Sequence, residues 1–148
     1  NGAERLGLSN VEAMQHDATE FAAQWEDRMD VVLADVPCSG YGIIRKKPDI
    51  RYKDPRTMED LPQLQLQILK NQARYVKPGG TLLYSTCTLL KRENEDVVKA
   101  FLQQREDFYL EPLALPAVFP ANTDGMLTLV PGEYDTDGFF FCRLRRKL

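Results

Sequence analysis

Two cysteines, each just after an apolar run, are the residues of this sequence best suited to covalent chemistry. Cys38 lies in Asp35-Val36-Pro37-Cys38-Ser39-Gly40, after the run 31–34, and Cys87 lies in Ser85-Thr86-Cys87-Thr88, after the run 81–84. Each run is typical of a buried strand, and a helix-length segment separates the two. We therefore expect parallel neighbouring strands, about 5 Å apart, that bring both thiols to one edge of a sheet.

An acid beside two thiols permits covalent addition to an aromatic base. A thiolate adds readily to an electron-poor ring carbon such as C6 of a pyrimidine, once the site lowers the thiol pKa of about 8.5 or supplies a base. C5 then becomes nucleophilic if a proton or a strong hydrogen bond relieves the charge at N3. Asp35 would supply it if burial or another carboxylate raises its pKa. A second thiol could take part in the elimination that releases the product.

Composition narrows the classes of protein. The 148 residues suffice for one domain, and no stretch approaches the roughly 20 apolar residues of a membrane span. The formal net charge of -3 restricts any nucleic-acid contact to a local patch. With three cysteines and no export signal, we expect reduced thiols and a cytoplasmic location. A single histidine, His16, excludes a histidine-based triad and a multi-histidine metal site, so no metal is expected.

Alternating apolar periods predict an α/β sheet that ends in an antiparallel hairpin. The strands are expected at 11–14, 30–36, 81–86, 108–115, 126–130 and 139–144. The helices are expected at 19–26, from 61 to 76, and around 97–102, with acidic residues at the amino end of the last one. The run 30–36 is apolar enough for a strand covered on both faces. Because ligands of open α/β sheets bind beyond the carboxyl ends of strands, Asp17, Asp35, Cys38 and Cys87 converge on one candidate site.

A basic segment follows the first cysteine directly. Residues 45–56 hold six basic side chains, two acids and Tyr52. Such a run is often a solvated loop, but its place favours contact with phosphates flanking a target nucleotide, with Tyr52 available for stacking.

The two cysteine motifs, in this order, resemble those of the RNA cytosine-C5 methyltransferases of the Nol1/Nop2/Sun group. The segments Ile44-Arg45-Lys46-Lys47-Pro48-Asp49-Ile50 and Asp137-Gly138-Phe139-Phe140 are most similar to its bacterial 16S ribosomal RNA branch, the RsmB or Sun type. The resemblance runs from about residue 1 to the end. It implies a Rossmann-like methyltransferase fold, S-adenosylmethionine as cofactor and ribosomal RNA as partner.

The resemblance also implies roles for individual residues. Cys87 corresponds to the nucleophile that attacks C6, and Cys38 to the cysteine that assists release of the methylated base. Asp35 matches the acid that contacts N3 and lies near the methionine part of the cofactor, and Asp17 matches the acid that holds the adenine amino group. Pro37 would shape the loop that presents the base. Arg45, Lys46, Lys47 and Tyr52 are the candidate RNA contacts.

The resemblance leaves part of the family pattern unmatched. The family's Gly-rich cofactor loop and ribose-binding acid precede Asn1, so we expect residues 1–148 to be the C-terminal portion of one methyltransferase domain, with an incomplete sheet and an incomplete cofactor site. Without their neighbouring strand, residues 11–16 are expected to be displaced or to pair with another chain, which would permit self-association. We expect the isolated chain to bind S-adenosylmethionine weakly and to be inactive alone.

Plainer interpretations remain for each feature. Cys38 and Cys87 could be small core residues, as Cys142 is expected to be. Asp17 could cap the helix that follows it, and Asp35 could be a turn residue. The chain could be a non-catalytic RNA-binding module that keeps the substrate side without a donor site. A thiol–disulfide protein is a weaker alternative, because the sequence has no Cys-x-x-Cys.

Overall fold

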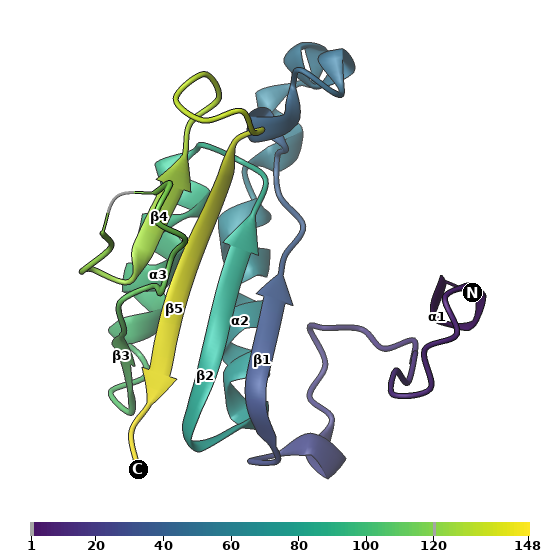
Figure 1. Cartoon of the computed structure of the whole chain (residues 1–148), viewed down its shortest axis with the longest axis vertical. Helices are drawn as coiled ribbons and strands as arrows, with labels where there is room; N and C mark the ends of the chain where they lie inside the picture. The colour runs from purple at the N-terminus through teal and green to yellow at the C-terminus, as the bar shows by residue number, and fades with distance from the viewer. Residues whose placement is uncertain (1, 120) are drawn as a thin grey trace.

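The strand expected at 30–36 is the edge of a five-stranded mixed sheet in the computed structural model, which describes residues 2–119 and 121–148. This strand, β1 (Met29–Asp35), pairs in parallel with β2 (Val76–Thr86), which confirms the predicted neighbours. The path across the sheet is β1-β2-β5-β3, and β4 pairs with β5 beside β3 (Figure 1). The fold is therefore the expected α/β class with antiparallel strands at its end.

The remaining elements follow the predicted order with shorter bounds in places. The helices are α1 (Gly2–Arg5), α2 (Leu61–Tyr75) and α3 (Glu95–Leu102). The other strands are β3 (Phe108–Leu110), β4 (Met126–Leu129) and β5 (Phe139–Arg146). Short 3-10 turns are η1 (Ala23–Trp25), η2 (Tyr41–Ile43), η3 (Pro48–Tyr52), η4 (Pro55–Met58) and η5 (Lys91–Glu93).

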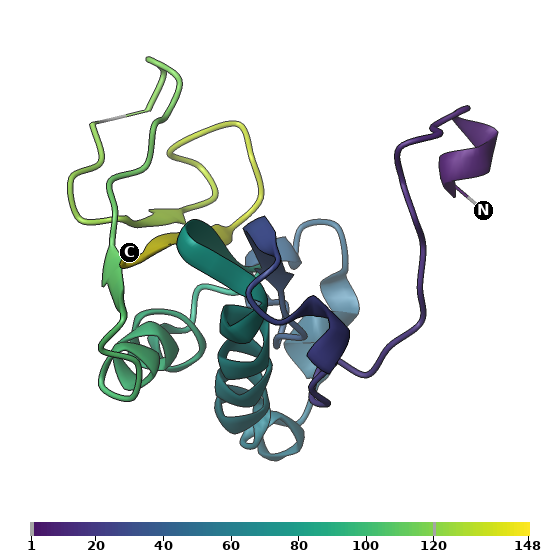
Figure 2. The ribbon, with the colours of Figure 1, turned by 90° about the horizontal axis from the view of Figure 1, so that it is seen from below.

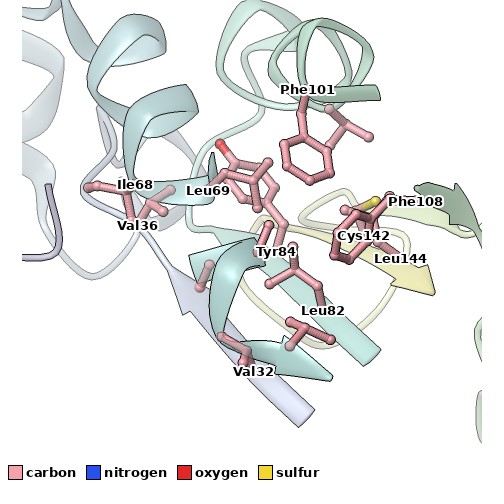
Figure 3. Close-up of a cluster of buried hydrophobic side chains, with 14 of the residues drawn as sticks. Val32, Val36, Ile68, Leu69, Leu82, Tyr84, Phe101, Phe108, Cys142 and Leu144 are labelled. Atoms are coloured by element: carbon pink, nitrogen blue, oxygen red, sulfur yellow. The ribbon is translucent and has the colours of Figure 1, made fainter. Parts of the chain in front are cut away.

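The hydrophobic core lies between the sheet and two helices. Figure 2 shows α2 and α3 on the same side of the sheet. Strand and helix side chains meet there, as Figure 3 shows for Val32, Leu82, Tyr84, Leu69 and Phe101. Cys142 of β5 is fully buried in the same cluster, as predicted for a core cysteine. Burial raises the pKa of its thiol, so Cys142 stays protonated and inert.

The opposite face of β1 is open, which differs from the prediction of a strand covered on both faces. Val32 and Ala34 are buried, whereas Val31 and Leu33 are 59% and 63% exposed. Alternation along the strand places the two pairs on opposite faces. The apolar run at 31–34 is therefore covered on one side by the described part of the chain.

The β2 strand starts earlier than expected. The helix α2 passes directly into it at Val76, and Pro78-Gly79-Gly80 lies within the strand rather than before it. The pairing partner of Met29 is Val76 but that of Val31 is Thr81, so the extra residues form an irregularity around Gly79, whose φ is 76°. From Thr81 onward the register is regular up to Asp35 and Ser85.

The antiparallel end of the sheet is built around β5. β2 pairs with it along six residues, and β4 pairs with its first half, which confirms the predicted hairpin. β3 pairs with its last residues. The strand expected at 108–115 extends only to Leu110, since Leu110 opposite Leu144 is the last of its paired residues.

The N-terminal predictions are partly wrong. Residues 11–14 form no strand, and residues 8–16 run off the sheet edge as an irregular segment (Figure 1). This agrees with a displaced segment, while pairing with another chain stays a prediction. Residues 19–26 contain only η1 instead of a helix. Packing of Trp25 and Phe21 against Tyr75 of α2 anchors this turn, with ring centroids 5.7 Å apart in each pair.

Two glycines bring the ends of distant segments into backbone contact. Gly42 N donates to Cys87 O at 2.9 Å, and Gly138 N donates to Gly42 O at 2.8 Å. A Cβ added at Gly42 would lie 2.1 Å from Gly138 O and 2.8 Å from Cys87 O. Only glycine permits this approach, which joins the loop after β1, the end of β2 and the start of β5.

We predict that Gly42→Ala lowers the free energy of unfolding by about 2 to 3 kcal/mol, because the new methyl group overlaps backbone atoms that cannot move aside. Urea unfolding followed by circular dichroism measures the effect. Gly2→Ala is the matched control, since a Cβ there meets nothing within 4 Å. Equal unfolding midpoints for the two variants would contradict the close approach.

Candidate functional site

The parallel pairing of β1 and β2 carries both cysteines past the same edge of the sheet. Asp35 stands opposite Ser85 at the end of the register, and Val36 N still donates to Ser85 O at 3.2 Å beyond it. Cys38 Sγ and Cys87 Sγ then lie 3.2 Å apart, and Cys87 N donates to Cys38 Sγ at 3.3 Å. Both thiols are free and half-buried. The prediction that the two cysteines meet at one edge is confirmed.

The two thiols differ in their surroundings. Burial raises the pKa of Cys38 to about 12, and the hydrogen bond with Cys87 acts in the same direction. Cys38 therefore keeps its proton at neutral pH and can donate it toward the sulfur of Cys87. The pair thus places a proton-bearing thiol, Cys38, in contact with a second thiol, Cys87.

Asp35 stands at the carboxyl end of β1, and its side chain is exposed. Its carboxylate accepts a hydrogen bond from Ser85 Oγ at 2.8 Å, which orients it at the carboxyl end of β1. Burial was one of two conditions under which Asp35 would be a protonated acid, and the described part of the chain does not bury it. Pro37 is also exposed, and its carbonyl accepts from Gln65 Nε2 of α2 at 2.9 Å.

A cavity of about 410 Å³ opens in front of the two sulfurs. Its volume is within the range of small-ligand sites, which run from about 300 to 1,000 Å³. Besides Cys38 and Cys87, its lining includes Gly40, Ile50, Lys47 and Lys53. The lining of the cavity therefore combines two thiols with the ammonium groups of three lysines and one carboxylate, Asp49, so it has a net positive charge that suits a phosphate-bearing ligand.

Two of the four predicted RNA contacts are engaged within the protein. Lys46 Nζ lies 2.5 Å from Asp137 Oδ2, and Arg45 Nε lies 3.7 Å from Asp137 Oδ1. The Asp137 side chain is only 2% exposed, whereas both cations are mostly exposed. Their charge is thus partly offset by a buried anion. Lys47 lines the cavity, and Tyr52 is 80% exposed on η3.

Asp17 is held locally. It accepts from Thr19 N at 2.8 Å and from Thr19 Oγ1 at 2.7 Å, and these bonds hold the pKa of its carboxyl below the usual value. The adjacent Ala18 carbonyl accepts from Asn71 of α2. The helix that Asp17 was considered to cap is absent, and its carboxylate makes a turn instead. Among the described residues, the structure does not bring Asp17 into contact with Asp35 or the cysteines.

Sequence reasoning missed a buried polar group behind the site. Glu93, expected at the amino end of α3 for its charge, is fully buried and accepts from the backbone N–H of Ser39 at 2.9 Å. Ser39 Oγ also contacts Thr88 Oγ1 at 2.8 Å. The sequence offered one signal, an acid that follows the second cysteine motif closely. Its partner lies on a distant segment and could not be read from spacing.

The described ranges 2–119 and 121–148 hold no group of three or more His, Cys, Asp or Glu side chains placed to bind a metal ion. Within these ranges, no helix is long and apolar enough to cross a membrane.

Relatives of known name match almost the whole chain. Residues 1–145 match the family model described as 16S rRNA methyltransferase RsmB/F. The chain is 44% identical over 151 residues to the probable ribosomal RNA small subunit methyltransferase B of Bacillus subtilis, covering 98% of this chain and 34% of that protein. It is 37% identical over 148 residues to the ribosomal RNA small subunit methyltransferase F of Escherichia coli O6:H1, covering 96% and 31%.

Solved structures match as well. The crystal structure of PH0851 has a TM-score of 0.88 at 36% identity, over 97% of this chain and 33% of that one. NSun6 from Pyrococcus horikoshii, solved with SFG, has a TM-score of 0.74 at 27% identity, over 97% and 36%. The chain thus spans about a third of the length of these relatives. It belongs to the 16S rRNA methyltransferase RsmB/F family.

Proposed function

We propose that residues 1–148 are the C-terminal portion of an S-adenosylmethionine-dependent methyltransferase domain that methylates C5 of a cytosine in 16S ribosomal RNA. The observation that carries the proposal is the pair of sulfurs, 3.2 Å apart at the mouth of a cavity. Family membership supports the reaction class. A bacterial enzyme acting on the small ribosomal subunit would work in the cytoplasm.

Cys87 is the nucleophile in this proposal. Before the reaction, the S–H of Cys38 stabilises the Cys87 thiolate by a hydrogen bond. The Cys87 sulfur then forms a bond to C6 of an unstacked cytosine. Asp35, oriented by the hydrogen bond from Ser85 Oγ, donates to N3 in its protonated form, which requires the bound base to bury a carboxyl that is exposed in the free chain. The electron pair displaced from the C5–C6 bond then makes C5 nucleophilic. S-adenosylmethionine is the methyl donor that the family resemblance implies for C5.

Cys38 assists release once the adduct exists. In the adduct, Cys87 is a thioether, which carries no charge and no longer accepts a hydrogen bond from the Cys38 thiol. The charge and the hydrogen bond of Cys87, which both raise the pKa of Cys38, are then lost. After losing its proton to solvent, the Cys38 thiolate takes the C5 proton. The C5–C6 double bond re-forms, the C6–S bond breaks, Cys87 leaves as a thiolate, and N3 returns its proton to Asp35. Burial alone then keeps Cys38 a strong base.

The described residues do not by themselves fit a complete donor site. The two acids assigned to it, Asp17 and Asp35, each accept from a neighbouring hydroxyl group, of Thr19 and Ser85. This observation favours a second candidate, a non-catalytic RNA-binding fragment. In both candidate functions, Pro37, Lys47 and Tyr52 contact the RNA. Arg45 and Lys46 add positive charge that their ion pairs with Asp137 partly neutralise.

The assignment of the thiols is tested with RNA that carries 5-fluorocytidine, in a complete enzyme containing this chain. Fluorine at C5 cannot leave as a proton, so the covalent adduct persists and is visible on denaturing gels. We expect the adduct to disappear in Cys87→Ala and to remain in Cys38→Ala. An adduct that survives Cys87→Ala would overturn the assignment.

Donor binding separates the two candidates. We expect titration calorimetry of the isolated 148 residues with S-adenosylmethionine to give a dissociation constant weaker than about 1 mM, equivalent to less than about 4 kcal/mol of binding free energy. Low-micromolar binding would contradict this. An RNA mobility shift without donor binding would favour the RNA-binding fragment.

Lys47→Gln tests the RNA face of the cavity. Loss of one phosphate contact should reduce the slope of log affinity against log salt by about 0.7 for single-stranded RNA. Mobility shifts at several salt concentrations measure the slope. Lys70→Gln is the control, because Lys70 bonds to Gln104 away from the cavity. Equal slopes for the two variants would remove Lys47 from the RNA contacts.

A further inference from the structure

A carboxylate that the reaction does not use is buried directly behind the first cysteine. Glu93 is fully buried, and its Oε2 accepts from Ser39 N at 2.9 Å and from Gln65 Nε2 at 3.0 Å. The Ser39 amide is the one that follows Cys38 in the chain. The same Gln65 nitrogen donates to Pro37 O at 2.9 Å, on the other side of Cys38. The backbone is therefore held before and after the thiol.

The segment that carries Glu93 is itself fixed to the second cysteine loop. Tyr84 OH donates to Glu93 O at 2.6 Å. Thr86 Oγ1 donates to Asn94 Oδ1 at 2.6 Å, and Asn94 Nδ2 donates to Thr88 O at 3.0 Å. These contacts lie on both sides of Cys87 in the chain. The short segment Glu93–Asn94 therefore binds the loop of Cys38 and the loop of Cys87.

We propose that Glu93 is a positioning residue, which holds the Cys38 loop against the Cys87 loop by accepting hydrogen bonds from Ser39 and Gln65. The catalytic meaning of this role rests on the function proposed above. The structural part, a fixed distance between two thiols, does not.

A role in general stability alone explains the residue poorly. A buried carboxylate is costly to desolvate, and an apolar residue of similar volume is often at least as stabilising. Here an apolar side chain would leave the Ser39 N–H without its acceptor, and a buried unpaired donor is itself unfavourable. The acid is thus explained by the two groups that donate hydrogen bonds to it. One is the Ser39 amide of the Cys38 loop, and the other is Gln65, which also donates to Pro37 O of that loop.

The geometry assigns the role to one oxygen. Oε2 receives both hydrogen bonds, whereas Oε1 and Gln65 Oε1 are buried and have no hydrogen-bond partner among the described residues. A glutamine could place its carbonyl oxygen where Oε2 lies and its amide nitrogen where Oε1 lies. Glu93→Gln should therefore keep the loop in place, and Glu93→Leu should release it.

The test is the alkylation of each cysteine of the 148-residue chain by iodoacetamide, followed by mass spectrometry from pH 6 to pH 11. In the wild type we expect slow labelling of Cys38 and none of the buried Cys142. Release of the loop exposes Cys38 and separates it from Cys87, so its pKa falls from about 12. Each unit of that fall raises the thiolate fraction at pH 8 about tenfold, so Glu93→Leu should label Cys38 at least about tenfold faster.

Three controls make the result decisive. Glu93→Gln should follow the wild-type pH profile, and Glu106→Gln, an exposed acid remote from the cysteines in sequence, should change nothing. Labelling of Cys142 reports unfolding, and if Glu93→Leu unfolds, Gln65→Met takes its place with the same expected direction.

Several outcomes would overturn the proposal. The first is an unchanged rate of Cys38 alkylation in a folded Glu93→Leu or Gln65→Met variant. The second is a pH profile of Cys38 alkylation in Glu93→Gln that matches the profile in Glu93→Leu. The third is labelling of Cys142 in both Glu93→Leu and Gln65→Met. The assay needs neither RNA nor a methyl donor. A failed 5-fluorocytidine experiment would therefore count against the proposed function, and an unchanged Cys38 rate against Glu93.

Discussion

The parallel pairing of β1 with β2 is the constraint on which the site depends. Two thiols far apart in the chain meet only because both strands run in the same direction and end at the same edge, in the register that sets Asp35 opposite Ser85. The helix α2 makes this possible, since it returns the chain to the start of β2 and buries Leu69 against the sheet. Its Gln65 then reaches back to Pro37 O. Core packing and site geometry are thus supplied by the same connection.

Much of this arrangement is visible in the sequence, and the failures have a physical cause. The runs at 31–34 and 81–84 are apolar enough to specify strands, and the helix between them is the kind of connection that parallel strands need. Residues 11–14 have a strand-like composition, but a strand exists only with a hydrogen-bonded neighbour, and among the described residues none lies beside them. Residues 19–26 have a helical composition, but contacts of Phe21 and Trp25 with Tyr75 hold a short turn there instead.

The side-chain partners were less predictable than the strands. The turn at Asp17 is local, and an aspartate two residues before a threonine is a readable signal for it. The pairing of Lys46 with the buried Asp137, by contrast, depends on backbone contact between Gly42 and Gly138, which no local pattern encodes. The same holds for Glu93, whose position before α3 fits the helix dipole equally well. Local preferences such as the helix dipole indicate where a charged residue is tolerated. Which groups it binds depends on tertiary contacts.

The Cys38 thiol is kept protonated here without any charged neighbour in hydrogen-bonding contact with either sulfur among the described residues. The Cys38 side chain is half-buried and accepts a hydrogen bond from the Cys87 amide. It keeps its proton because burial disfavours the thiolate. Cys87 gains a donor from that same burial. The protonation of Cys38 therefore depends on how closely its loop is held, and the elements that hold it, namely the strand register, the Gly42 contact and Glu93, all lie within this chain. The setting of Cys38 is thus a property of these residues alone. By contrast, the acids assigned to the methyl donor, Asp17 and Asp35, accept from their neighbours' hydroxyl groups, and the described residues do not join them into one site.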